Sequence, residues 1–90
     1  MNIEELFGII EERVRKKSKQ SYTNKLLKLG PGYIAQKFGE ESTELIVDYL
    51  KGSKKRTIEE AADVIYHLLV LLKSKKITLK DINNELDKRK

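Results

Sequence analysis

The segment at residues 58–73, IEEAADVIYHLLVLLK, constrains the fold more than any other part of the chain. Drawn as a helix at about 100° per residue, it is apolar on almost every side. Polar side chains fill only a sector of roughly 60°, which holds Glu60, Asp63 and His67. A helix that is apolar almost all round is buried, so we expect these groups to face the interior or a cleft. Ionised carboxylates in such a place need a compensating partner.

The rest of the sequence has helical periodicity and no strand pattern. Ser21, Thr57 and Thr78 are suitable caps for the second, fourth and fifth helices. The expected helices lie at about residues 2–17, 22–29, 31–50, 58–74 and 79–87. The predicted fold class is therefore all-α: one domain, residues 1–90, forming an antiparallel bundle of about five helices built on the third and fourth.

Composition favours a folded protein of the cytoplasm. Charged residues make up 37% and apolar residues 39% of the 90 residues, a balance typical of globular proteins. The chain has no cysteine, which excludes disulfides and thiolate metal sites. The longest apolar run, VIYHLLVLL, is too short to span a bilayer, and the first ten residues lack the features of a signal peptide. We expect a cytoplasmic location and no association with a membrane.

The third expected helix carries acidic residues beside its apolar face. On a helical wheel Glu41 lies at the edge of the apolar arc, with Lys37 and Glu44 just beyond it. Glu40 points further toward solvent. Because Glu41 and Glu44 are three residues apart, they project side by side from one face of the helix.

Antiparallel packing of the third and fourth helices would bring four acids to one point: Glu41, Glu44, Glu60 and Asp63. Four carboxylates in contact repel one another strongly, and a divalent cation is the simplest remedy. Oxygen ligands alone suit Mg²⁺ or Mn²⁺, whereas zinc more often takes histidine or cysteine. The spacing E-x-x-E followed by E-x-x-D therefore predicts a metal site.

Each acid also has a simpler interpretation. Glu60 lies three residues after Thr57 and could close a capping box. The acids at positions 40 and 41 could only favour the start of a helix. Asp63 could pair with His67 one turn later. The metal site is favoured by the four residues together, not by any one of them.

The segments SYTNKLL, GPGYIAQKFGEE and EEAADVIYHLLVLL, in this order and spacing, resemble the phosphoribosyl-ATP pyrophosphohydrolase family. This family belongs to the all-α, MazG-type nucleoside triphosphate pyrophosphohydrolases, and the resemblance extends from about residue 21 to 72. It implies Mg²⁺-dependent hydrolysis of phosphoribosyl-ATP to phosphoribosyl-AMP and pyrophosphate, the second step of histidine biosynthesis. It also implies a homodimer that completes the helical bundle.

Residue by residue, the resemblance implies that the metal ligands are Glu41, Glu44, Glu60 and Asp63. The candidate catalytic acids are Glu40, Glu41 and Glu44, with Glu40 the weaker candidate for orienting a water. The candidate substrate contacts are Lys37, Lys25, Thr23 and His67. Two of these have an alternative: Lys37 could simply pair with Glu41, and a lone histidine such as His67 is usually a core residue.

Two other functions compete with the hydrolysis of phosphoribosyl-ATP, and sequence features distinguish them from it. A general pyrophosphohydrolase that clears nucleoside triphosphates would share the metal site, although SYTNKLL and YHLLVLL argue against it. A basic helical module for nucleic acid would use the net charge of +5 and the basic runs at 13–19, 54–56 and 88–90. Such a module needs no buried acids. We therefore expect a phosphorylated nucleotide as the partner, and not a nucleic acid.

Overall fold

A computed structural model describes residues 1–17 and 21–90, and within these ranges the chain forms five α-helices and no strand. They are α1 (Ile3–Lys16), α2 (Tyr22–Leu29), α3 (Pro31–Lys51), α4 (Lys54–Ser74) and α5 (Leu79–Lys88). The predicted all-α fold class is confirmed. Ser18 and Lys19, which end the first basic run, lie outside the described residues.

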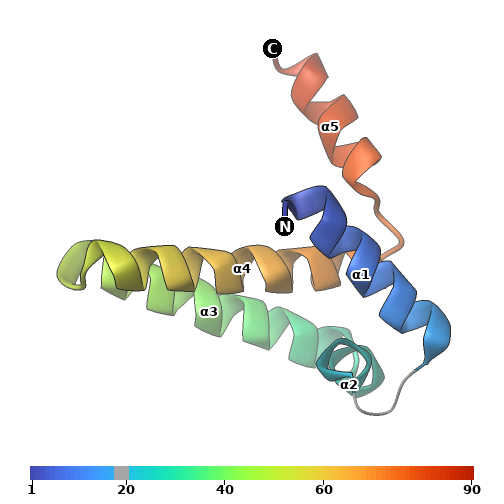
Figure 1. Ribbon diagram of the computed structural model, residues 1–90, viewed down its shortest axis with the longest axis horizontal. Coiled ribbons are helices and arrows are strands. Elements are labelled where there is room, and N and C mark those ends of the chain that lie inside the picture. The colour runs from blue at the N-terminus through green and yellow to red at the C-terminus, as the bar shows by residue number, and fades with distance from the viewer. Residues whose placement is uncertain (18–20) are drawn as a thin grey trace.

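The centre of the fold is an antiparallel hairpin of the two long helices. α3 and α4 lie side by side along most of their length and are joined by a two-residue turn, Gly52 and Ser53 (Figure 1). A Cβ atom at position 52 would lie 2.9 Å from the backbone carbonyl oxygen of Asp48, so the close return of the chain requires glycine there. This hairpin brings the acidic segments of the two helices opposite each other.

The start of α4 differs from the prediction by about one turn. The helix begins at Lys54 because the hydroxyl of Ser53 accepts a hydrogen bond from the backbone N–H of Arg56. The hydroxyl of Thr57 instead donates to backbone carbonyls of Ser53 and Asp48. The capping box between Thr57 and Glu60 is therefore wrong, and the carboxylate of Glu60 has another role.

The remaining helices cover one end of the hairpin. α1 crosses the C-terminal half of α4, α2 lies against the first turns of α3, and α5 projects away (Figure 1). The buried apolar side chains form one cluster: Phe7, Ile10, Leu26, Ile34, Leu69, Val70 and Leu72. Residues from all four of the first helices meet in it, so it holds α1 and α2 against the hairpin. α5 contributes no buried residue.

The prediction that α4 is buried on nearly every side is wrong for a single chain. Ile58 is 61% exposed and Leu68 is 37% exposed, because α1, α2 and α3 cover only part of the helix. None of the described helices is both long enough and apolar enough to cross a membrane. The single chain thus leaves part of the apolar surface of α4 exposed.

Candidate metal centre

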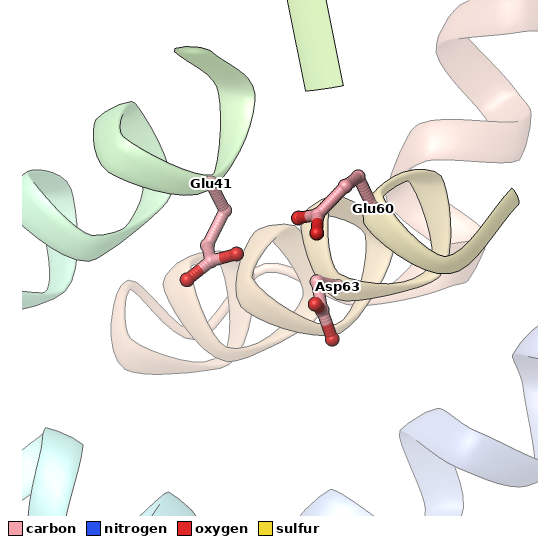
Figure 2. A group of neighbouring side chains, drawn as sticks. All are labelled: Glu41, Glu60 and Asp63. Carbon is pink, nitrogen blue, oxygen red and sulfur yellow. The ribbon is translucent and has the colours of Figure 1, made fainter. Parts of the chain in front are cut away.

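Three carboxylates meet between the two long helices. Glu41 extends from α3, and Glu60 and Asp63 extend from successive turns of α4, with the carboxylates of Glu41 and Glu60 facing each other (Figure 2). One carboxylate oxygen from each of the three residues lies within 4.8 Å of the other two. Residues three apart share a helix face, and the antiparallel hairpin places Glu41 opposite that face.

Glu60 is buried, Glu41 is half-buried and Asp63 is exposed, so the expectation that Asp63 faces the interior is wrong for a single chain. Burial makes the negative charges of Glu41 and Glu60 unfavourable without a cation. Glu60 is 4% exposed, and its Oε2 atom has no hydrogen-bond partner. Burial raises the pKa of Glu60, an effect that Arg56 opposes and that Glu44 reinforces. Burial also raises the pKa of Glu41, and the nearby carboxylate of Glu44 adds to the shift. Both acids therefore lie where their negative charge is disfavoured.

The donor set fits a hard divalent cation. All three side chains offer carboxylate oxygen, the ligand type that Mg²⁺ and Mn²⁺ prefer. A buried carboxylate oxygen without a partner costs free energy that a bound cation would recover. The acidic cluster and the unpaired Oε2 of Glu60 are two separate observations, and both favour a cation here.

Of the four predicted ligands, Glu44 is the one outside this group of three. It is exposed on α3 and close enough to the carboxylates of Glu41 and Glu60 to raise the pKa of both. Glu40, the weaker candidate, is engaged elsewhere: its carboxylate accepts hydrogen bonds from Gln36 at 3.0 Å and from Lys37 at 3.4 Å. The bond from Gln36 and the bond from Lys37 lower the pKa of Glu40.

Two of the predicted substrate contacts lie at opposite extremes of exposure. Thr23 is fully buried, and its hydroxyl shares a 2.5 Å hydrogen bond with the hydroxyl of Tyr66. In this arrangement Thr23 joins α2 to α4 and does not face solvent. Lys25 is exposed on α2.

Lys37 forms the ion pair proposed as its alternative role. Its ammonium lies 4.0 Å from the carboxylate of Glu41 and 3.4 Å from that of Glu40.

His67 is held beside the acids by two hydrogen bonds. Its Nδ1 atom lies 2.8 Å from the backbone carbonyl of Asp63, and its Nε2 atom lies 3.2 Å from the hydroxyl of Tyr22. A carbonyl only accepts, so Nδ1 of His67 carries a proton and donates to the carbonyl of Asp63. His67 thus pairs with Asp63 through the backbone, which leaves the Asp63 carboxylate available to the cluster.

Two residues near the acids were not among the sequence candidates. One is Tyr22, whose hydroxyl fixes the imidazole of His67. The other is Arg56, whose guanidinium lies 2.5 Å from Oε1 of Glu60. The spacing of four residues between Arg56 and Glu60 was the available signal, but the later predicted start of the helix excluded Arg56 from it.

We expect Glu41→Gln to stabilise the fold when a chelator removes divalent cations. Because the folded-state pKa of Glu41 is raised, its ionisation opposes folding above that pKa, and the opposition fades as the pH falls through it. The melting temperature should therefore exceed that of the wild type by a few degrees near neutral pH. The difference should shrink as the pH falls toward the ordinary value of 4.5.

Glu40→Gln is the matched control for this measurement. The pKa of Glu40 is lowered by Gln36 and Lys37, so its ionised form supports folding and its loss should slightly lower the melting temperature. The effect is small because the side chain is 46% exposed. Shifts of the same sign in both variants would contradict this account of the site.

Comparison with known proteins places the chain in a family. The family model described as phosphoribosyl-ATP pyrophosphohydrolase matches residues 3–90. The chain belongs to this family. The resemblance seen in the sequence is confirmed, and with it the class of enzyme, a hydrolase.

Several relatives in this family are named phosphoribosyl-ATP pyrophosphatase. The relative from Metallosphaera sedula is 47% identical over 97% of this chain and 94% of its own length. The relative from Sulfolobus acidocaldarius is 46% identical over 97% of this chain and 92% of its own. The relative from Paracoccus denitrificans is 52% identical over 77% of this chain and 64% of its own. The similarity to the first two extends over nearly the whole of both chains.

Proposed function

We propose that this chain hydrolyses the α–β phosphoanhydride of phosphoribosyl-ATP, giving phosphoribosyl-AMP and pyrophosphate in histidine biosynthesis. Membership of the family supports the substrate. The observation that carries the chemistry is the carboxylate group of Glu41, Glu60 and Asp63, in which Glu60 is buried and its Oε2 atom has no hydrogen-bond partner. We further propose Mg²⁺ as its cation and the cytoplasm as its location, with residues 1–90 acting as one domain.

Cleavage of a phosphoanhydride requires positioning and charge neutralisation more than covalent chemistry. Glu41, Glu60 and Asp63 would hold the cation, which when bound supplies positive charge for the phosphate oxygens. Glu44 is exposed beside them, and we assign its carboxylate to accept the proton of the attacking water. Glu40, bonded to Gln36 and Lys37, would act only through Lys37.

Basic and aromatic groups border the acids on the side of α2. Burial raises the pKa of Tyr22, and the positive charge of Lys37 opposes that rise. Lys37 would turn from its glutamates to a phosphate of the substrate, and Lys25 offers a second ammonium on α2. Tyr22 and His67, joined by their hydrogen bond, would form a polar wall for the same substrate.

The test is pyrophosphate release from phosphoribosyl-ATP beside a panel of ordinary nucleoside triphosphates. We expect strong preference for phosphoribosyl-ATP, loss of activity in chelator and recovery on adding Mg²⁺. Comparable turnover of the ordinary triphosphates would instead favour a general pyrophosphohydrolase. Release that persists in chelator would contradict the role given to the acids.

We also propose that two copies of the chain associate through the free end of the hairpin. Several apolar side chains are exposed on the last turns of α3 and the first turns of α4: Ile46, Val47, Tyr49, Leu50 and Ile58. Tyr49 is 73% and Leu50 is 69% exposed. Clustered apolar exposure of this kind marks a protein contact, and a second copy would bury it by adding its own hairpin to form a larger bundle.

A further inference from the structure

One arginine contacts carboxylates on both helices of the hairpin. The Nη2 atom of Arg56 lies 2.5 Å from Oε1 of Glu60 and 3.7 Å from Oδ2 of Asp48. Its Nη1 atom lies 3.5 Å from Oε1 of Glu59. All of these residues except Glu59, together with Thr43, Glu44 and Val47, line a pocket of about 290 Å³ between α3 and α4. Arg56 is therefore fixed at the border of the acidic group by both helices.

The two oxygens of Glu60 have different surroundings. Oε1 accepts the hydrogen bond from the guanidinium of Arg56, whereas Oε2 is buried and has no partner. The bond to Oε1 fixes the plane and rotamer of the carboxylate, because a buried side chain with one strong charge-assisted bond has little freedom left. The unpaired Oε2 is then the oxygen that stays available to a cation.

The charge of Arg56 would by itself oppose a cation nearby. Two observations reduce that effect. Asp48 and Glu59 also lie within ion-pair distance of the guanidinium and offset its charge. The side chain of Arg56 is 53% exposed, so water and salt screen what remains. The hydrogen bond to Glu60 is screened less, because the carboxylate of Glu60 is buried.

We infer that Arg56 is a positioning residue of the cation site: its guanidinium, balanced by Asp48 and Glu59, orients Glu60 so that Oε2 becomes the ligand atom. The inference rests on the proposed cation site. Partners that orient a metal ligand through a hydrogen bond commonly change metal affinity by about 10–100-fold when they are removed. Arg56 therefore acts on cation affinity through Glu60 and touches neither substrate nor cation.

The test is the affinity of the full chain for Mn²⁺, measured by the signal of free Mn²⁺ in electron paramagnetic resonance. We expect Arg56→Ala to weaken binding by about 10–100-fold. Arg56→Gln keeps a hydrogen-bond donor without the charge and should retain most of the affinity. Lys55→Ala, which removes a positive charge from the neighbouring exposed position, should leave it unchanged. Melting temperatures in chelator verify that each variant is folded.

The outcomes separate this inference from the proposed function. Tighter Mn²⁺ binding in both Arg56→Ala and Arg56→Gln would show that the positive charge of Arg56 repels the cation, and it would overturn the inference. Equal Mn²⁺ affinity in all variants would show that Arg56 only forms a surface ion pair. This result would also overturn the inference, while leaving the cation site intact. Absence of Mn²⁺ binding by the wild type, or binding unaffected by Asp63→Asn, would overturn the cation site and the inference together.

Discussion

Glu60→Gln is expected to lower the rate of pyrophosphate release by at least about 100-fold, since a partner that merely orients a ligand already changes metal affinity by about 10–100-fold. Glutamine has the same shape but carries no charge, and only one of its two terminal atoms can bind a cation. The loss should appear at saturating Mg²⁺ as well as at low Mg²⁺. Steady-state kinetics over a range of Mg²⁺ concentrations measures both.

Glu59→Gln is the matched control for this variant. Glu59 is adjacent in the same helix, but its side chain is 47% exposed and its ion pair with Arg56 is longer, at 3.5 Å. Exposed pairs of this kind contribute about 0–1 kcal/mol, so activity should remain close to that of the wild type. Equal losses in the two variants would mean that burial in the acidic group does not matter for the reaction.

Leu50→Lys is expected to weaken self-association of the chain by about 30-fold or more. Leu50 is 69% exposed in the single chain. Burying a leucine side chain contributes about 1.5–3 kcal/mol, and each 1.4 kcal/mol is tenfold in affinity. A lysine in the same place loses this contribution and adds a charge that must be desolvated. Sedimentation velocity over a range of protein concentrations measures the change in mass.

Leu86→Lys provides the comparison. Leu86 is also exposed, at 59%, but it lies on α5, away from the free end of the hairpin. Its replacement should leave the association unchanged. A monomeric wild type at all concentrations, or dissociation by Leu86→Lys alone, would exclude the free end of the hairpin as the contact between copies.

Much of the helical structure follows from local sequence. α2 was predicted with its bounds, and α1, α3 and α5 to within one or two residues, because caps and breaks such as Ser21, Gly30 and Thr78 act over single turns. Gly30, with φ at 97°, separates α2 from α3 in a conformation that favours glycine. The start of α4 was predicted one turn too late, because Ser53 and Thr57 are equally suitable caps by residue type. In the structure Ser53 accepts the capping bond from Arg56, whereas the hydroxyl of Thr57 donates to the carbonyls of Ser53 and Asp48.

The sequence by itself determined the all-α class, the acidic face of α4 and the facing acids of α3, since residue spacing and helical period decide which side chains share a face. The tertiary structure decided which side chains of different helices meet, because the helical period of a single helix does not determine this. It brought Glu41 to Glu60 and Asp63 while leaving Glu44 exposed. It also placed Asp48 of α3 beside Arg56 of α4 and left the apolar end of the hairpin open. These outcomes depend on the register of one helix against another, and that register is set by packing across the hairpin.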